Sequence, residues 1–388
     1  MRSEAGARTA GQHAEVAQEW AAELADACSG HGVSAAYQPI VDLARGVTVG
    51  FEALARFDHP QRLGPDVWLA RARNAGCAAE LEATCLRSAL SARPLLPPNC
   101  FLTVNVSPDL LAANPIRAVW ADEGDLSGLV IELTEQAPIE DYRALEGDLT
   151  ALRTAGALIA VDDAGAGYAG LRHLLALRPA IIKLDRELIR DVDVDQAKLA
   201  LVEMLGVFAG RIDAWMLAEG IERPGELAAL ADLGVPLGQG YALARPGPHW
   251  PDLQEAAVSV LRERDRQSAN RTVRGLIETV PFARNTAEAA ALSINEPTGA
   301  VVLLDQHDRP HSLYHRDLAL LGPGEPAMRI NVDTHPRDAL LRATTREPGE
   351  RFQPLLCTDN AGRYLGIVRM ERLINALADS DQNSNQER

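Results

Sequence analysis

Cysteine, long apolar runs and positive charge are all scarce in this sequence. The five cysteines are scattered, odd in number and without a C-x-x-C pair, which argues against a disulfide framework and against a zinc–thiolate site. No segment approaches the roughly 20 consecutive apolar residues of a membrane-spanning helix. The first 24 residues contain glutamates where a signal peptide would have an apolar core. These absences predict a cytoplasmic protein that is not attached to a membrane.

The charge balance is strongly acidic. A formal net charge of −16 and an isoelectric point of ≈ 5.0 argue against general binding of DNA, RNA or anionic membranes, because those polyanions attract basic surfaces. A local basic pocket for a small anionic ligand is compatible with this charge. The 388 residues are enough for two domains, or for one barrel and a smaller unit.

Strand-like and helix-like patterns alternate along the first part of the chain. The predicted strands cover residues 33–41, 47–57, 101–106, 129–135, 158–163, 180–185 and 214–219, with a last short stretch at 238–241. The predicted helices cover residues 13–28, 66–92, 141–155, 171–177, 195–211 and 226–233. Such alternation indicates an α/β fold built from parallel β-α units.

Polar residues lie within, late in or just after the successive apolar runs. In the strand predicted at 47–57, Glu52 and Arg56 share one face with Leu54, because side chains alternate along a strand. The later runs carry Asn105, Glu132, Asp162, Asp163, Lys183, Glu219 and Gln239. In a (β/α)8 barrel these positions converge at the C-terminal rim, where such enzymes place their sites. A doubly wound open sheet is the alternative, and it would gather its ligand at one switch point.

Five of these polar residues are carboxylates, at positions 52, 132, 162, 163 and 219. Their repulsion within one cavity would be relieved by hard divalent cations such as Mg²⁺ or Mn²⁺, which prefer oxygen ligands. Two metals about 3.5–4 Å apart suit in-line displacement at phosphorus. Lys183 would orient or deprotonate the attacking water, and Arg56 would hold phosphate. Structural interpretations exist for single residues: Asp162 and Asp163 can open a turn, and Asn105 can cap a helix.

Several motifs between Ala35 and Pro246 resemble those of the EAL-domain family of cyclic-di-GMP phosphodiesterases. The matching segments are Tyr37-Gln-Pro-Ile-Val-Asp42, Glu52-Ala-Leu-Ala-Arg56, Asn105-Val-Ser107, Glu132-Leu-Thr-Glu135, Asp162-Asp163, Lys183-Leu-Asp185, Ala218-Glu-Gly-Ile-Glu222 and Gln239-Gly-Tyr241. The resemblance implies a TIM-like barrel whose first strand is antiparallel. It also implies metal-dependent hydrolysis of one phosphodiester of cyclic di-GMP to linear pGpG, by a homodimer.

The same resemblance implies roles for individual residues. Two divalent ions, Mg²⁺ or Mn²⁺, are expected. The first would be held by Glu52, Asn105, Glu132 and Asp162, and the second by Asp162, Asp163 and Glu219. The implied catalytic residues are Lys183, which would act on the water, Glu219 and Gln239 nearby, and Glu135, which would anchor the loop after Asp163. Contacts with the substrate are implied for Gln38, Leu54, Arg56 and Asp185.

The loop after Asp163 departs from the family pattern. The segment Asp162-Asp-Ala-Gly-Ala-Gly-Tyr-Ala-Gly170 has alanine or glycine where the family usually has a phenylalanine and hydroxyl side chains. The metal ligands are retained, so we expect an active phosphodiesterase. The alternative is an EAL-domain receptor that binds cyclic di-GMP and signals without hydrolysing it, because the altered loop holds the second metal loosely.

A weak internal repeat occupies the C-terminal third. An offset of 54 residues relates three pairs of positions: Asp305 and Asp359, Arg309 and Arg363, and Asp317 and Glu371. Each unit is predicted to contain a helix, a strand, a turn, a strand and a helix. The repeat resembles a tandem pair of cystathionine-β-synthase-type (CBS) modules, in which Asp317 and Glu371 would bind the ribose of an adenine nucleotide. The implied role is regulatory, and a structural α+β appendage without ligand is the alternative.

Together these patterns predict a TIM-like barrel followed by a smaller α+β domain. The expected divisions are an N-terminal tail and helix at 1–30, an EAL domain at 31–250, a linker helix at 251–271, a CBS-like pair at 272–380 and a disordered tail at 381–388. The linker is indicated by Pro246-Gly-Pro248 and by the charged run from Arg262 to Arg271.

Overall fold

The computed structural model describes residues 20–59, 61, 63–133, 142–162, 174–267, 272–294, 296, 300–315, 327–332, 334–359 and 362–386. Three residues for which a role at a site was predicted, Glu135, Asp163 and Asp317, lie outside these ranges, as does the glycine loop at 165–167. Within the described ranges, none of the helices combines the length and the apolar character that crossing a membrane requires.

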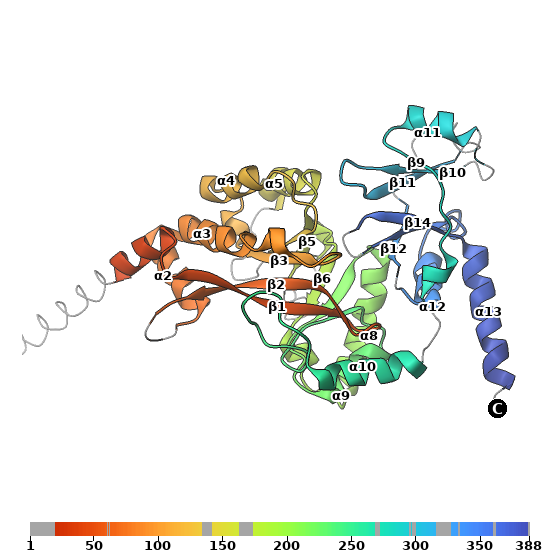
Figure 1. The fold of residues 1–388 in the computed structure, drawn as a ribbon, viewed down its shortest axis with the longest axis horizontal. Helices are drawn as coiled ribbons and strands as arrows, with labels where there is room; N and C mark the ends of the chain where they lie inside the picture. The colour runs from red at the N-terminus through yellow and green to blue at the C-terminus, as the bar shows by residue number, and fades with distance from the viewer. Residues whose placement is uncertain are drawn as a thin grey trace, which may run out of the picture.

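Eight strands close into a barrel in the order in which they occur in the chain (Figure 1). They are β1 (Val33–Asp42), β2 (Val47–Phe57), β3 (Phe101–Val106), β4 (Leu129–Leu133), β5 (Leu158–Val161), β6 (Ile181–Leu184), β7 (Trp215–Ala218) and β8 (Leu237–Gly238). β1 is antiparallel to its neighbours β2 and β8, whereas the other neighbouring strands are parallel. The predicted barrel with an antiparallel first strand is confirmed, and the open sheet is excluded.

Helices surround this barrel. Those described before residue 233 are a helix at 20–28, α2 (Pro65–Ala75), α3 (Ala78–Leu90), α4 (Asn114–Glu123), α5 (Tyr142–Thr154), a turn of helix at 174–177, α7 (Arg186–Ile189), α8 (Gln196–Arg211) and α9 (Pro224–Asp232). The single helix predicted at 66–92 is two helices, because Gly76 adopts a left-handed φ of 76° and ends α2. α4 was not predicted, although Pro115 stands in its first turn, where proline is favoured.

Apolar side chains fill both sides of the barrel wall. Val104, Ile131 and Ile182, which alternate with the polar residues of their strands, belong to the large core between strands and helices. A second cluster fills the interior near the start of the strands and consists of Ile40, Val49, Phe101, Val130, Ala160, Ile181, Leu217 and Leu237. A barrel filled in this way has no channel, so the polar residues further along the strands form a separate site at the C-terminal ends.

A smaller α+β unit, residues 272–386, follows α10 (Glu255–Gln267), and we refer to it as the C-terminal module. Its elements are β9 (Phe282–Ala283), α11 (Thr286–Ser293), β10 (Ala300–Leu304), β11 (Pro310–His315), β12 (Arg329–Asn331), α12 (Pro336–Thr344), β13 (Leu355–Thr358), β14 (Tyr364–Val368) and α13 (Met370–Gln386). They form two three-stranded sheets, ordered β11-β10-β9 and β12-β13-β14. Each half therefore has a leading strand that was not predicted. The helix predicted to follow β11 falls outside the described residues, and α13 continues into the segment predicted as a disordered tail.

The repeated Asp-x-x-x-Arg pattern has the same conformation in both halves of the module. Asp305 N–H donates to the Arg309 carbonyl at 2.9 Å, and Asp359 N–H donates to the Arg363 carbonyl at 3.0 Å. In return, the Oδ1 atom of each aspartate accepts from the main-chain N–H of its arginine, at 2.9 and 2.8 Å. The aspartates thus close equivalent hairpins between β10 and β11 and between β13 and β14, which is a local structural role.

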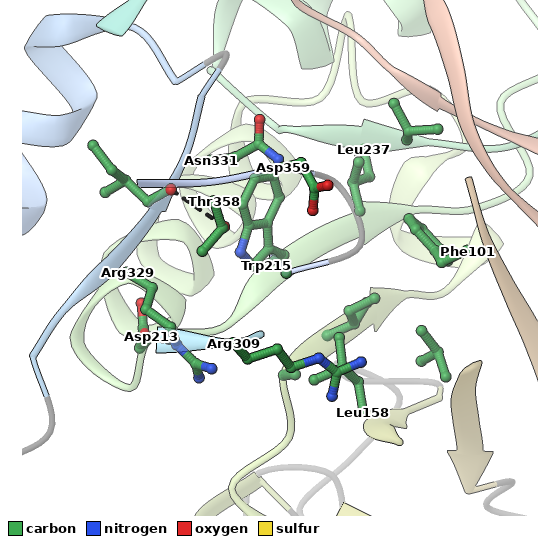
Figure 2. Close-up of a pocket in the computed structure, with 16 residues that line it drawn as sticks. Phe101, Leu158, Asp213, Trp215, Leu237, Arg309, Arg329, Asn331, Thr358 and Asp359 are labelled. Atoms are coloured by element: carbon green, nitrogen blue, oxygen red, sulfur yellow. Dashed lines mark hydrogen bonds and ion pairs between the residues drawn. The ribbon is translucent and has the colours of Figure 1, made fainter. Parts of the chain in front are cut away.

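The C-terminal module lies against the end of the barrel at which the parallel strands begin (Figures 1 and 2). The Arg342 guanidinium donates to the Asp213 carboxylate, two residues before β7. Gln306 Nε2 donates to the Thr154 carbonyl at the end of α5, at 2.9 Å. The described part of the module thus contacts the end of the barrel opposite to the one where the parallel strands finish.

Candidate active site

The C-terminal ends of the barrel strands bring the predicted acidic and amide side chains together. Glu52, Asn105, Glu132 and Lys183 lie on β2, β3, β4 and β6, and Asp162, Glu219 and Gln239 directly follow β5, β7 and β8. The strand register produces this arrangement, because Asn105 is level with Glu132 and Gln38 is level with Glu52. The polar residues therefore share one site, as the barrel interpretation requires.

Lys183 lies at the centre of the acidic residues. Its Nζ atom is 2.6 Å from Glu132 Oε2 and 2.6 Å from Glu219 Oε1. Asp162 Oδ1 and Glu52 Oε1 follow at 3.5 and 3.6 Å. The lysine side chain is 1% exposed, so its ammonium group is paired by protein carboxylates rather than by solvent.

The pKa values at this site reflect an excess of buried negative charge. Burial raises the pKa of Glu132 well above its usual range, against the opposing effect of Lys183. Burial likewise raises the pKa of Glu219 to about 8. Burial would lower the pKa of Lys183, but the surrounding carboxylates raise it well above its ordinary value. Burial also opposes ionisation of Glu52, yet Lys183 and two amide donors lower its pKa. The buried acids outnumber the ammonium group, so the site favours further positive charge.

The donor set fits a divalent metal ion. Glu132 Oε1 is buried and has no hydrogen-bond partner within the described part of the chain, while Lys183 occupies the other oxygen. Asn105 donates through Nδ2 to Glu52 Oε1 at 3.0 Å, which leaves its own Oδ1 atom as an oxygen ligand beside this carboxylate. Carboxylate and carboxamide oxygens that exceed the available positive charge are the environment that hard divalent cations prefer.

Two glutamines fix the other side of Glu52. Gln239 Nε2 donates to Glu52 Oε2 at 2.7 Å and to Gln38 Oε1 at 2.9 Å. Gln38 in turn donates to the Ala244 carbonyl at 2.9 Å, which ties β1 to the loop after β8. This chain of amides holds the Glu52 carboxylate in one orientation.

Glu82 is a buried residue beside the site that sequence reasoning missed. It is buried on α3, and its two carboxylate oxygens accept from Ser107 N–H at 2.6 Å and from Ser107 Oγ at 2.7 Å. Arg73 adds a donation to Ser107 Oγ at 2.8 Å. These bonds fix the chain two residues beyond Asn105. A single glutamate on the buried face of an otherwise apolar helix was the available signal.

Three residues with predicted substrate contacts lie further out. Leu54 and Arg56 continue β2 beyond Glu52 and are half-buried, and Arg56 Nη1 donates to the Ala55 carbonyl at 2.9 Å. Asp185 follows β6, and its Oδ2 atom accepts from Glu187 N–H at 3.0 Å, which caps α7. The structure thus places Leu54 and Arg56 on the strand that carries Glu52, and gives Asp185 a capping role.

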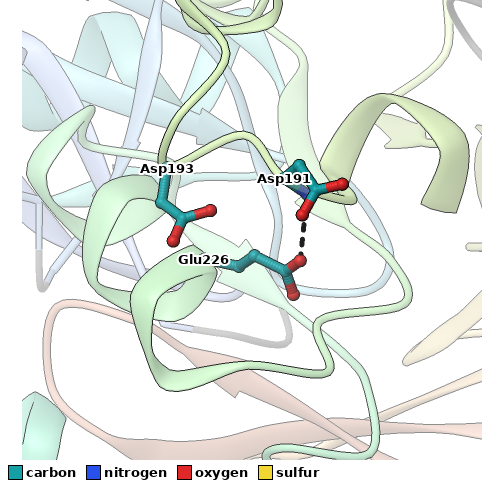
Figure 3. A group of neighbouring side chains, drawn as sticks. All are labelled: Asp191, Asp193 and Glu226. Atoms are coloured by element: carbon teal, nitrogen blue, oxygen red, sulfur yellow. Dashed lines mark hydrogen bonds between the residues drawn. The ribbon is translucent and has the colours of Figure 1, made fainter.

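A second acidic group, near the start of α9, has a different character (Figure 3). Asp191, Asp193 and Glu226 lie within coordination distance of one another. Arg223 contacts all three, at 2.9, 2.6 and 3.0 Å, and Glu226 also accepts from the N–H groups of Asp191 and Arg223. Protein donors already satisfy this group, so it fastens the loop after α7 to α9.

Comparison with known proteins identifies relatives of the barrel. The sequence model of the family described as "EAL domain" matches residues 21–246, which end before the C-terminal module begins. Cyclic di-GMP phosphodiesterase NbdA of Pseudomonas aeruginosa is 32% identical over 223 residues, which cover 55% of this chain and 28% of that protein. A second cyclic di-GMP phosphodiesterase of that organism is 32% identical over 230 residues, with 55% and 38% covered. The chain thus spans about a third of the length of these curated relatives.

Solved structures also resemble the chain. The structure titled "PaMucR Phosphodiesterase, c-di-GMP complex" is 27% identical with a TM-score of 0.54, over 60% of this chain and 98% of that chain. Klebsiella pneumoniae BlrP1, in a complex with calcium and cyclic di-GMP, is 30% identical with a TM-score of 0.52, over 58% of each chain. These two structures therefore pair the same fold with the same bound dinucleotide.

Proposed function

The chain belongs to the EAL-domain family, and we propose that it hydrolyses one phosphodiester bond of cyclic di-GMP to give linear pGpG. The observation that carries this proposal is the contact of Lys183 Nζ with four carboxylates at the ends of the strands, from Glu52, Glu132, Asp162 and Glu219. NbdA is named as a cyclic di-GMP phosphodiesterase, and the related structures of PaMucR and BlrP1 contain cyclic di-GMP.

Two divalent ions would be held by the oxygen ligands of this site. We assign the first ion to Glu52, Asn105, Glu132 and Asp162, and the second to Asp162, Asp163 and Glu219. Bound divalent ions lower the pKa of a coordinated water and polarise the phosphoryl oxygens. Calcium accompanies cyclic di-GMP in the BlrP1 complex, and we propose Mg²⁺ or Mn²⁺ for this chain because both suit oxygen ligands.

The side chains of the site would orient the reactants. Lys183 is held by Glu132 and Glu219 at 2.6 Å, and its ammonium group would donate to the attacking water or to a phosphoryl oxygen. Gln239 keeps Glu52 in position through its 2.7 Å donation. Arg56, beyond Glu52 on β2, would pair with a phosphate of the substrate. Substrate contacts of Gln38, Leu54 and Asp185, and the loop anchor at Glu135, belong to the same proposal.

Incubation of the purified protein with cyclic di-GMP and Mg²⁺ or Mn²⁺, followed by chromatography of the nucleotides, tests this assignment. We expect pGpG to accumulate, and a chelator to stop its formation. Glu52→Ala should reduce turnover by about 10²-fold or more, because it removes a buried ligand that the amides hold in place. Glu146→Ala, on the exposed face of α5, is the matched control and should retain full turnover.

A receptor that binds cyclic di-GMP without hydrolysis is the second candidate, and the alanines at positions 164, 166 and 169 favour it. Intact cyclic di-GMP recovered in complex with the protein would support the receptor and contradict the enzyme. Wild-type turnover by Glu52→Ala would contradict the proposed metal ligands.

We further propose that the C-terminal module is a regulatory pair of CBS-like units and that the protein is a homodimer. The proposed domains are residues 31–250 and 272–380, joined by a linker helix at 251–271 that includes α10. Support comes from the shared order of elements in the two halves, β9-α11-β10-β11 and β12-α12-β13-β14. Binding of ATP to the full chain, and its loss in Glu371→Ala, tests the predicted nucleotide site at Asp317 and Glu371. Sedimentation tests the dimer.

A further inference from the structure

A cavity lies between the C-terminal module and the end of the barrel at which the strands begin (Figure 2). Its volume is ≈ 100 Å³, well above the roughly 10–15 Å³ that a single water requires on this measure. The barrel contributes Phe101, Leu158 and Trp215, each the first residue of its strand. The charged lining residues are Arg309, Arg329 and Asp359 from the module, and Asp213 from the turn before β7. The cavity thus combines an apolar, partly aromatic floor with a charged wall, in which Arg309 is the buried member.

Arg309 is the unusual residue of this cavity. It is 6% exposed, and its Nη2 atom is buried without a hydrogen-bond partner among the residues that the structure describes. The side chain passes Gly362, where a Cβ atom would lie 3.5 Å from Nε, and its guanidinium group reaches the vicinity of Leu158 (Figure 2). Burial lowers the pKa of this guanidinium, but an arginine remains protonated in a protein. A buried guanidinium therefore forms part of the cavity wall.

Four acids act on this guanidinium or line the cavity, and each has another partner. Asp125 lies 3.1 Å from His307 Nδ1. Asp213 accepts from Arg342 and lies 3.7 Å from Arg329. Asp305 and Asp359 each accept from the main-chain N–H groups of their own hairpins. A buried charge without a direct partner is unfavourable, so an added anion would be bound strongly at this position.

We propose that the cavity binds a small organic anion, whose carboxylate or phosphate group pairs with Arg309 and whose apolar part lies against Trp215 and Phe101. Arginine suits either group, because its planar fork of N–H donors matches two oxygens of a carboxylate or a phosphate. The small volume selects a compact ligand, and the aromatic floor favours one with a ring.

This site is separate from the acidic site at the other end of the barrel. Along β7, Trp215 lines the cavity, Leu217 belongs to the apolar interior, and Glu219 contacts Lys183. The apolar layer that contains Leu217 therefore separates the two sites. Binding of the anion does not depend on the proposed hydrolysis, and the two proposals can fail independently.

Titration of the full chain with benzoate and with phenyl phosphate tests the proposal, with benzamide as the neutral counterpart of benzoate. We expect one or both anions to raise the midpoint of thermal unfolding and to bind in calorimetry, whereas benzamide has no effect. The two anions distinguish a carboxylate ligand from a phosphate ligand. Glu52→Ala should leave the response unchanged, because Glu52 lies beyond the apolar layer.

Arg309→Met keeps the apolar stem and removes the charge. We expect this variant to unfold at a higher temperature than the wild type without anion, and to bind the anion about tenfold or more weakly. Arg346→Met is the matched control: Arg346 is also partly buried in the module, but it donates to the Gln353 carbonyl at 2.7 Å. It should lower the unfolding midpoint and keep the response to anions.

Three results would overturn the proposal. The first is that neither anion shifts the unfolding midpoint of the wild type. The second is that the shift persists in Arg309→Met. The third is that Arg309→Met unfolds at a lower temperature than the wild type. The last result would mean that Arg309 stabilises the empty protein, as a paired structural arginine does.

Discussion

The two ends of the barrel differ in the sign of the buried charge that they hold. At the C-terminal ends of the strands, four carboxylates surround the ammonium group of Lys183. At the other end, the strands present apolar side chains, and the charge is the guanidinium of Arg309 from the C-terminal module. The difference shows how one set of short strands takes part in two sites. Alternate positions of each strand face the barrel interior. The interior positions at the start of the strands are apolar, and those at the end carry the acidic residues.

The acidic end has more of its charge balanced by the chain than the basic end. Lys183 makes two 2.6 Å contacts, whereas Nη2 of Arg309 has no partner in the described ranges. We therefore expect loss of Lys183 to cost stability, and to cost less when divalent metal is present. Substitutions at the basic end should cost little.

Lys183→Met gives the largest effect that this comparison predicts. Removing the ammonium leaves buried carboxylates without their main partner, and we expect a loss of about 3–5 kcal/mol in the free energy of unfolding in the presence of a chelator. Divalent metal should recover much of this loss, because it supplies positive charge to the same oxygens. Urea unfolding with chelator and with Mg²⁺ measures both quantities.

Lys198→Met is the control for this experiment. Lys198 Nζ also donates to two oxygens, the carbonyls of Glu187 and Arg190, but it lies outside the acidic site. The stability that Lys198→Met loses should be the same with and without metal. An equal loss for Lys183→Met under the two conditions would remove the metal-binding interpretation of the acidic end.

The acidic end could be predicted from sequence because each of its polar residues is recognisable from its neighbours along the chain, and the barrel places these residues in a regular way. Each polar residue interrupts or follows an apolar run, as Glu132 does in the fully buried strand β4. A barrel then brings the ends of all its strands together. Glu82 was missed because its role depends on where α3 packs, and the spacing of a helix does not reveal what its buried face contacts.

Glu82→Gln tests the support that α3 gives to the chain after Asn105. Its effect on stability should be smaller than that of Lys183→Met. Glu82 accepts two bonds from Ser107, and an amide can accept one of them while presenting a donor to the other. We expect a loss of about 1–3 kcal/mol in stability and a fall in kcat with little change in KM, because Asn105 two residues earlier is displaced. Glu80→Ala, at an exposed position of the same helix, should change neither quantity.

The effect of Glu82→Gln should depend on pH. Burial raises the pKa of Glu82 above its value in the unfolded chain, although the bonds from Ser107 oppose this shift. The protonated form is therefore favoured by folding, and its contribution to stability is lost as pH rises through the folded pKa. The advantage of the wild type over the variant should be greatest in acid and decrease towards neutral pH. A difference that grows with pH would mean that the ionised carboxylate is the stabilising form.

The basic end could not be predicted from sequence, because it forms where the barrel meets the C-terminal module, two segments that are far apart in the chain. The repeat marked Arg309 as equivalent to Arg363, and the hairpin bonds of the two aspartates account for that equivalence. Nothing in the repeat indicates that one of the two arginines is covered by the barrel. That placement depends on contacts between remote surfaces, such as Arg342 with Asp213 and Gln306 with Thr154.

Asp213→Asn gives the smallest predicted effect and sharpens the comparison. Asp213 lines the cavity and contacts Arg342 and Arg329, and all three side chains are partly exposed, at 30%, 17% and 43%. Partly exposed ion pairs contribute about 0–1 kcal/mol, so the stability of the chain should fall by less than about 1 kcal/mol. The affinity for benzoate or phenyl phosphate should rise by about two- to fivefold, because a carboxylate that repels the anion is lost and Arg329 is released. The rise should shrink at high salt. If the affinity falls instead, Asp213 positions Arg329 for the anion, and the basic wall then acts through geometry rather than through net charge.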